Sequence, residues 1–483
     1  MAPAVEPEEE KARKMLLGKP RRCCGLTADM GASHGMSLIL KLELYNSRLT
    51  ELPPGLASCK NLQHLDIGAN PNISSLDGIE GLSQLRILFA SGCEGLGPSL
   101  PVGGPLTQLP SLFMLAVKET GLTVLDGAAL PNTLGWLIAA QNKISMIKNP
   151  GRLSGVRKLM LSHNEITTDE VDKLLLAIPG LEMLRIAGNR LQTLPAAVTT
   201  HPHLAWIALS GNPYTARRLE AASINLPSDA ATSLFDASAI AVSDVELGRG
   251  SGAVVVRGEW AIDTVQSVKL GTPVAVKQWT SAQFSDGDAR GEWVMGRLTG
   301  GNDAMVRTLG TWEQPTLGMA LELLDGATAV GGPPSFESVT RDTFIEGKHE
   351  KLLPAQAVAV ALQVAHACNW LHTRGICHGD VYLHNTLRVT SGESAGTIRL
   401  SDLGAACTYD RLRDAVLERI EVRSFGFLVQ DLLKWIQLTD EIGNQQLVRL
   451  REVAESCEAE KVEELPTFDA ITSSLHAIES IAL

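Results

Sequence analysis

The chain has 483 residues, of which 45% are apolar and 20% charged, and its formal net charge at pH 7 is −12. This composition is typical of a soluble globular protein with two or three domains. The acidic balance argues against nucleic-acid binding, and no apolar run reaches the length of a membrane span. The eight cysteines have no metal-ligand spacing. The N-terminus also lacks the hydrophobic core of a secretory signal, so we expect free thiols and a cytoplasmic location.

Residues 1–35 combine an acidic run at Glu8–Glu10 with a basic cluster that ends at Arg21 and Arg22. Few apolar residues interrupt these charges, so the segment cannot bury a core of its own. We therefore predict a disordered tail. It contains the adjacent cysteines Cys23 and Cys24, and the sequence leaves open whether they are modified.

From Ile39 onward the pattern LxxLxLxxNxL recurs eight times. Its polar position falls every 22 to 27 residues, at Ser47, Asn70, Cys93, Thr120, Asn142, Asn164, Asn189 and Asn212. In such a pattern the leucines stack into one continuous core, and the asparagine bonds backbone groups that a short strand leaves unpaired. A run of amphipathic helices is excluded because the period is not 3.6. The pattern resembles a leucine-rich-repeat solenoid, which we assign to residues 36–216.

The residue between the two strand leucines of each repeat should point to the concave face of a solenoid. The eight positions are Glu43, Asp66, Phe89, Ala116, Ile138, Met160, Arg185 and Ala208. The middle four are apolar, and exposed apolar side chains on a concave surface usually mark a partner site. We therefore expect a protein partner or substrate to bind through Phe89, Ile138 and Met160. The alternative is that another part of the chain covers this face.

A polar stretch, 217–239, with breakers at Pro227 and Asp229, predicts a linker. The sequence pattern after the linker predicts a strand, a glycine-rich turn at Gly248–Gly252 and a second strand. Glycines let backbone N–H groups approach phosphate oxygens without a Cβ in the way. The strand TPVAVKQW follows and supplies Lys277, and the helical segment ARGEWVMGRL supplies Glu292.

The stretch CHGDVYLHNTL, 377–387, and the turn SDLG, 401–404, carry the remaining candidate chemistry. Phosphoryl transfer needs one carboxylate to hold the accepting hydroxyl and oxygen ligands to fix Mg²⁺ on the phosphates. Asp380 can be that carboxylate. Asn385 and Asp402 can be the ligands, because Mg²⁺ prefers hard oxygen donors.

Together these motifs, in this order, resemble the protein-kinase family. The resemblance implies a bilobal kinase-like domain over 240–483, so the expected fold is multi-domain α/β and α+β, a solenoid followed by that domain. It implies catalytic roles for Asp380, Lys277 and Glu292, with Mg²⁺ at Asn385 and Asp402. It also implies ATP binding by Leu247, Gly248, Gly250, Gly252, Val255, Ala275, Lys277, and the hinge residues Glu322 and Leu324.

Two departures from the family pattern lie in the catalytic loop. Gly379 stands where the family has the arginine of HRD, and Tyr382 replaces the lysine two positions past the aspartate. His384 could reach the γ-phosphate in place of that lysine. The long helix that follows carries Glu421 where an aspartate is usual.

The activation segment also departs from the family, because only 16 residues, 405–420, separate the DLG turn from that helix. No APE motif is present, and Leu465 stands where its partner arginine would be. The APE glutamate and its partner arginine are both missing, and so is the HRD arginine that would bind a phosphate on this segment. We therefore predict that Thr408 and Tyr409 do not form a phosphorylation switch.

The leading interpretation is an intracellular Mg·ATP-dependent kinase that phosphorylates serine or threonine in proteins, with the repeats recruiting a partner or substrate. A nucleotide-binding pseudokinase scaffold is the first alternative, favoured by Tyr382 and the missing APE segment. A small-molecule phosphotransferase on a kinase-like fold is the second, favoured by the HGD sequence.

Overall fold

The computed structural model describes residues 38–224, 234–250, 252–262, 269–437 and 440–482, so the tail predicted for 1–35 and its cysteine pair lie outside the described residues. By compactness the chain forms two units, residues 1–181 and 182–483. The last two repeats therefore belong to the same compact unit as the kinase-like part. The boundaries predicted at 216 and 240 follow the sequence pattern, a different criterion, and stay predictions.

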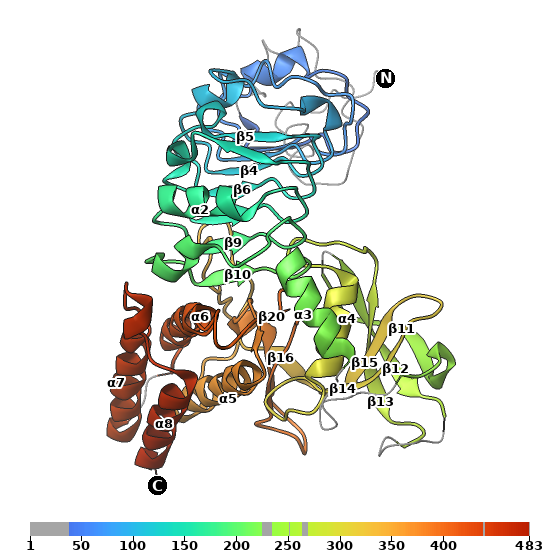
Figure 1. The fold of residues 1–483 in the computed structure, drawn as a ribbon, viewed down its shortest axis with the longest axis vertical. Coiled ribbons are helices and arrows are strands. Elements are labelled where there is room, and N and C mark those ends of the chain that lie inside the picture. The colour runs from blue at the N-terminus through green and yellow to red at the C-terminus, as the bar shows by residue number, and fades with distance from the viewer. Residues whose placement is uncertain (1–37, 225–233, 251, 263–268, 438–439, 483) are drawn as a thin grey trace, which may run out of the picture. The chain divides into compact units, whose positions relative to one another are not determined.

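In the first unit, six strands of three residues each lie parallel in chain order (Figure 1). The central leucine of every strand is buried, because that side of the strand faces the stacked core. These strands are β1 (Lys41–Glu43), β2 (His64–Asp66), β3 (Ile87–Phe89), β4 (Met114–Ala116), β6 (Trp136–Ile138) and β8 (Lys158–Met160). The other elements are β5 (Val124–Asp126) paired with β7 (Met146–Lys148), the 3-10 turns η3 (Pro54–Ser58), η4 (Glu94–Leu96), η5 (Pro105–Gln108), η6 (Gly127–Ala129) and η7 (Pro150–Leu153), and α2 (Thr168–Ala177).

The asparagines of the pattern hold neighbouring repeats together. Asn70 donates through Nδ2 to the carbonyls of Leu44 (2.9 Å) and Ile67 (2.7 Å), and its Oδ1 accepts from the N–H groups of Ser47 and Leu49. In the next repeat Cys93 Sγ contacts the Ile67 carbonyl at 3.2 Å and is a buried free thiol. The predicted structural role of the polar position therefore holds for both residue types.

The four apolar positions predicted for the concave face end strands β3, β4, β6 and β8 and lie in register. Phe89, Ile138 and Met160 are partly exposed. Ala116 is only 4% exposed, which corrects the expectation of four exposed apolar residues. A methyl group is too short to emerge between larger neighbours, so the partly exposed apolar surface is carried by three side chains.

The second unit begins with the last two repeats and continues into a sheet. The repeats give β9 (Met183–Arg185), η8 (Ala196–Thr200), β10 (Trp206–Ala208) and α3 (Pro213–Ile224). A five-stranded antiparallel sheet follows in the order β11-β12-β13-β15-β14, with α4 beside it (Figure 1). Its elements are η9 (Ala237–Ala239), β11 (Ile240–Arg249), β12 (Ala253–Trp260), β13 (Pro273–Trp279), α4 (Ala289–Leu298), β14 (Thr308–Trp312) and β15 (Gly318–Glu322).

The rest of the second unit is mainly helical, and α5 to α8 pack on one another around one apolar core (Figure 1). α5 begins at Pro354, as predicted, because proline needs no N–H partner in the first turn. The elements are β16 (Ala327–Ala329), α5 (Pro354–Thr373), β17 (Ile376–Cys377), η10 (Leu383–Asn385), β18 (Thr386–Val389), β19 (Ile398–Leu400), β20 (Cys407–Thr408), α6 (Val416–Leu433), α7 (Glu441–Ser456), η11 (Val462–Glu464), α8 (Phe468–Glu479) and η12 (Ser480–Ala482).

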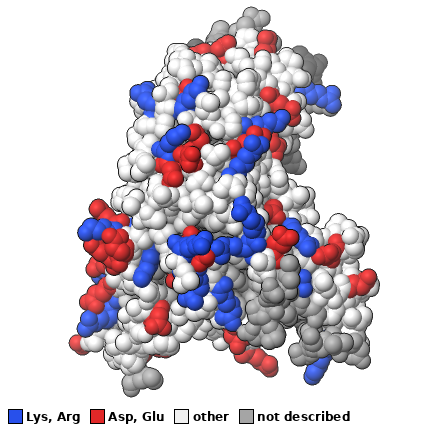
Figure 2. Space-filling model, viewed as in Figure 1, with Lys and Arg blue, Asp and Glu red and all other residues white. Residues whose placement is uncertain are grey.

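Most of the face shown in Figure 2 is uncharged, and charges of both signs lie next to one another in several separate groups. Arg290 and Glu313 form one exposed ion pair. Among the residues that the structure describes, no helix is both long and apolar enough to span a bilayer.

Candidate phosphoryl-transfer site

Lys277 and Glu292, to which the kinase resemblance assigns catalytic roles, form an ion pair. Strand β13 presents the lysine. The helix α4 presents the glutamate in its first turn, after Asp288 caps the helix by accepting from the N–H of Gly291 at 2.7 Å. The second carboxylate oxygen of Glu292 accepts from Trp279 Nε1 at 2.9 Å. Both oxygens of Glu292 are thus engaged, which fixes the position of the ammonium.

Burial by itself would lower the pKa of Lys277, but the charges of Asp402 and Glu292 outweigh it and raise that pKa. Burial raises the pKa of Glu292, and the adjacent ammonium of Lys277 opposes this rise. The ammonium of Lys277 lowers the pKa of Asp402, so this carboxylate stays ionised. A fixed cation thus lies beside a carboxylate available to a metal.

The catalytic-loop residues Asp380 and Asn385 are also in contact. Asn385 Nδ2 donates to Asp380 Oδ2 at 2.8 Å and to the Asp380 carbonyl at 3.0 Å. The loop is tied to the DLG turn, because His378 Nε2 lies 3.1 Å from the Ser401 carbonyl and Ser401 Oγ donates to the Asn385 carbonyl at 2.7 Å. The two motifs therefore form one local framework.

Glu421, on helix α6, anchors the catalytic loop through hydrogen bonds to its backbone. It accepts from the N–H of Gly379 at 2.7 Å and of His378 at 3.3 Å, and it pairs with His372 Nε2 at 2.6 Å. Burial alone would raise the pKa of Glu421, but the contact with His372 outweighs it and lowers that pKa. A buried carboxylate with several donors is satisfied, so the glutamate serves where the family usually has aspartate.

Asp402 has a φ of +64°, a conformation that non-glycine residues rarely adopt and that tends to occur at functional sites. Its side chain is 50% exposed, and Oδ1 lies 3.7 Å from Lys277 Nζ. Since Asn385 uses its nitrogen toward Asp380, its amide oxygen is the atom suited to a metal. The described residues contain no cluster of three or more His, Cys, Asp or Glu that could hold an ion. Two oxygen donors, the Asn385 amide oxygen and the Asp402 carboxylate, fit an ion held mainly by phosphate oxygens and water, as Mg²⁺ usually is.

A cavity of about 70 Å³ lies where these groups meet. Lys277, Glu292, Asp380 and Asp402 line it, and the remaining lining residues are Gly250, Gly252, Ala253, Phe284, Asp286, Gly404 and Ala405. Phe284 is 8% exposed and lies against the glycine-rich turn, because a Cβ on Gly252 would come within 2.7 Å of its ring. The ring narrows the space for phosphates.

Six of the predicted nucleotide-binding residues do not line this cavity. Leu247 is 44% exposed and Ala275 is 9% exposed. Glu322 donates its N–H to the Arg307 carbonyl at 2.9 Å, and its side chain pairs with Arg307 and Arg399, so it could meet adenine only through its carbonyl. The residues in this group, whose roles stay predictions, are Leu247, Gly248, Val255, Ala275, Glu322 and Leu324.

Sequence reasoning missed three residues at the site, namely Arg185, Phe284 and Asp286. Arg185 reaches Asp380 across 195 positions of sequence. No spacing rule joins a repeat strand to a catalytic loop, although a charged residue directly after four apolar ones in the series of concave-face positions was a visible signal. Phe284 and Asp286 lie in a loop without a motif.

Both possible phosphate acceptors of the short activation segment are buried. Thr408 is 7% exposed and Tyr409 is 4% exposed. Tyr409 donates its hydroxyl to Glu418 Oε1 at 2.7 Å. His384, suggested as a substitute for the missing lysine, is instead paired with Asp342 at 2.7 Å.

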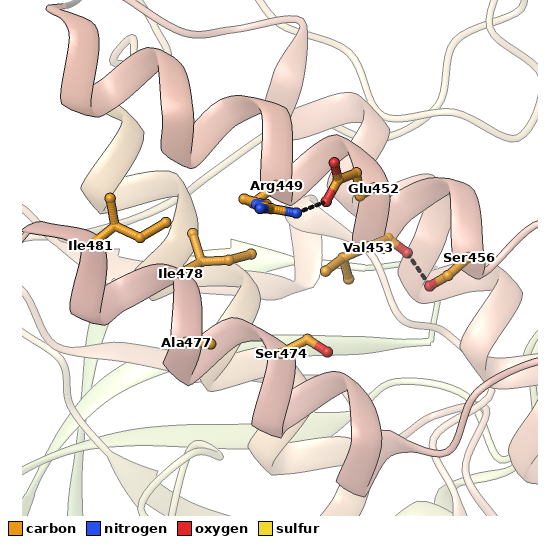
Figure 3. A pocket seen from close by; sticks show the side chains of 8 residues that line it. All are labelled: Arg449, Glu452, Val453, Ser456, Ser474, Ala477, Ile478 and Ile481. Atoms are coloured by element: carbon orange, nitrogen blue, oxygen red, sulfur yellow. Dashed lines mark hydrogen bonds and ion pairs between the residues drawn. The ribbon is translucent and has the colours of Figure 1, made fainter.

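A larger hollow of about 520 Å³ lies between α7 and α8 (Figure 3). Figure 3 shows an apolar floor of Val453, Ile478 and Ile481 with an Arg449–Glu452 ion pair on the rim. None of the predicted site residues lines it. The charged side chains that line it, Arg449 and Glu452, are exposed and paired with each other, so we assign the chemistry to the smaller cavity.

The fold and this site define a leucine-rich-repeat protein with a protein-kinase domain. In agreement, residues 242–423 match the family described as protein tyrosine and serine/threonine kinase. Residues 39–81 match the family described as leucine rich repeats (2 copies). The recognition made from sequence motifs is thereby confirmed, as is the fold class.

Curated relatives match about a third of the chain. Lumican of Rattus norvegicus is 31% identical over 157 residues, which are 32% of this chain and 45% of that protein. Lumican of Mus musculus gives the same identity and coverage. Podocan-like protein 1 of Mus musculus is 29% identical over 174 residues, 35% of this chain and 30% of that protein. The chain thus spans less than half the length of each relative.

Proposed function

We propose that this chain is a cytoplasmic Mg·ATP-dependent protein kinase that phosphorylates serine or threonine, with the repeats recruiting the partner or substrate. The observation that carries the proposal is the convergence of Lys277, Glu292, Asp380 and Asp402 on one cavity. A scaffold that only binds nucleotide has no need of Asp380, whose carboxylate acts on the acceptor. This argues against the pseudokinase alternative.

The proposed mechanism assigns each group one task. Bound Mg·ATP would supply the γ-phosphoryl group and neutralise part of its charge. Lys277, held by Glu292, would bind phosphate oxygens, and Asn385 and Asp402 would hold the metal. Asp380 would accept a hydrogen bond from the acceptor hydroxyl. This bond would orient the hydroxyl oxygen toward the phosphoryl group.

The test is turnover of ATP with Mg²⁺, with and without serine/threonine peptides, tyrosine peptides and small alcohols as acceptors. Asp380→Asn should keep Mg²⁺-dependent stabilisation by a non-hydrolysable ATP analogue and lose transfer by about 10²–10⁴-fold. Equal turnover by Asp380→Asn and the parent chain would reject the catalytic assignment. A preference for small alcohols would favour the small-molecule alternative.

One observation favours the small-molecule phosphotransferase alternative, and for this reason the test includes small alcohols. Trp206 stacks on Tyr382, with ring centroids 4.7 Å apart, and covers the loop face just past Asp380. An extended peptide could not lie on Tyr382 while this stack persists. Peptide acceptors would then have to enter from the cavity side.

Recruitment by the repeats is proposed to use Phe89, Ile138 and Met160, which are partly exposed and lie at corresponding positions of their strands. The double substitution Phe89→Glu with Met160→Glu should abolish partner recovery in a pull-down. The matched control is Lys41→Glu with Lys173→Glu, two exposed positions away from these strand ends. Unchanged recovery from a folded Phe89/Met160 variant would reject the surface.

A further inference from the structure

The catalytic carboxylate is held by an arginine from the next-to-last repeat. Arg185, the last residue of β9, donates through one terminal nitrogen to Asp380 Oδ1 and through the other to the Gly379 carbonyl at 2.8 Å. Its Nε lies 2.8 Å from Asp286 Oδ1. The side chain is only 3% exposed. Two carboxylates and a carbonyl thus surround a buried cation.

The two departures of the catalytic loop from the kinase pattern fit this repeat. Gly379 has a φ of +75°, and a Cβ there would lie 3.0 Å from the Ile207 carbonyl of β10 and 2.8 Å from the Ala405 carbonyl. An arginine at position 379 could not fit beside the repeat strand. Tyr382 stacks on Trp206, which also donates through Nε1 to the Val381 carbonyl at 3.2 Å.

A third contact extends the packing to helix α6. Arg423 donates to the carbonyls of His201 (2.7 Å) and Leu204 (3.2 Å) and is 4% exposed. Burial lowers the pKa of Arg423 to about 10. Elements that open as switches are drawn from weakly packed regions. Arg185, Trp206 and Arg423 are all buried, so we treat this contact as a structural part of the unit and not as a switch.

Arg185 leaves Asp380 accessible. The side chain of Asp380 is 17% exposed and lines the cavity together with Lys277 and Asp402. Arg185 binds Oδ1 and Asn385 binds Oδ2, so the carboxylate is clamped in one orientation while its remaining lone pairs face the cavity. An arginine that blocked the acceptor would instead separate Asp380 from that cavity.

We propose that Arg185 is a positioning residue of the kinase site, acting through Asp380. It takes the place of the cations that the loop has lost at Gly379 and Tyr382, so the catalytic apparatus includes the repeat. The inference rests on the proposed function, because it assigns Arg185 a part in phosphoryl transfer. A misplacement of a reacting group by about 1 Å can cost 10²-fold in rate.

The experiment measures kcat and KM for ATP with serine/threonine peptides, using the full chain. Arg185→Ala should lower kcat by about 10–100-fold with KM for ATP within twofold of the parent. Arg185→Lys, which keeps the charge without the forked geometry, should recover part of kcat. The control is Arg217→Ala, an exposed arginine whose side chain donates to Gln192. It should behave as the parent chain does.

Thermal melting accompanies every variant, so a loss of fold is separated from a loss of positioning. If Arg185→Ala does not fold, Arg185→Lys still decides, because a drop in its kcat of about threefold or more at unchanged melting temperature and KM supports the inference. An unchanged kcat in the folded Ala or Lys variant overturns it. A higher kcat in Arg185→Ala also overturns it and would make the arginine an inhibitory block. An inactive parent chain overturns the proposed function and this inference together.

Discussion

Replacing Glu421 by glutamine should destabilise the second unit, because this buried carboxylate, 2% exposed, anchors the catalytic loop. Glutamine has the same shape but only one acceptor oxygen. Whichever way its amide turns, the N–H of Gly379 or of His378 faces a nitrogen, and a buried unsatisfied group costs about 1–3 kcal/mol. The bonds that remain change from charge-assisted to neutral and lose about 1 kcal/mol each. Relief from burying a charge offsets part of this, so about 2–4 kcal/mol should remain.

The assay is thermal unfolding followed by tryptophan fluorescence. The chain has eight tryptophans, and all except Trp136 lie in the second unit, so the signal reports mainly on that unit. For a unit of the size of 182–483, a loss of about 2–4 kcal/mol corresponds to a melting temperature about 3–6 °C lower. The control is Glu452→Gln, a 53% exposed partner of Arg449 on α7, which should shift by no more than about 1–2 °C. If Glu421→Gln shifted no further than this control, the carboxylate would not be the anchor.

Three further predictions concern the cavity, a histidine and the activation segment. Phe284→Ala should lower KM for ATP about threefold or more, because the ring narrows the phosphate cavity; an unchanged or higher KM in steady-state kinetics would contradict this. Burial alone would lower the pKa of His384, but its contact with Asp342 outweighs burial and raises that pKa above 6.5. The stabilisation of the folded state by the His384–Asp342 contact is therefore fully present below pH 6.5, and it is lost as pH rises through the higher pKa that His384 has in the folded protein. In denaturant titrations the stability gap between the parent and His384→Asn should shrink between pH 6 and 9, and a widening gap would refute the sign. Thr408→Ala with Tyr409→Phe should leave turnover insensitive to phosphatase, as in the parent; a large loss of parent activity on dephosphorylation, absent from the double variant, would show that the segment is a switch.

The sequence by itself determined the parts of this protein that are encoded locally. The repeat period required a stacked core, and Asn70 bonds the backbone of its neighbours as that pattern demands. The order of the glycine-rich turn, Lys277, Glu292, Asp380 and Asp402 identified the kinase domain, because each motif sits on one strand, helix or loop with its own signature. Even Glu421, a departure from the family, could be matched to its position on the helix.

Only the tertiary structure decided what the departures mean. In the sequence, Gly379 and Tyr382 indicate only that the arginine and the lysine of the family pattern are missing. The structure explains both residues by strand β10, which lies against the catalytic loop. The contact between Arg185 and Asp380 spans 195 residues, and no sequence pattern around either residue predicts it. Local propensity and spacing act over a few turns of chain, whereas a buried ion pair between a repeat and a loop depends on how the whole unit packs.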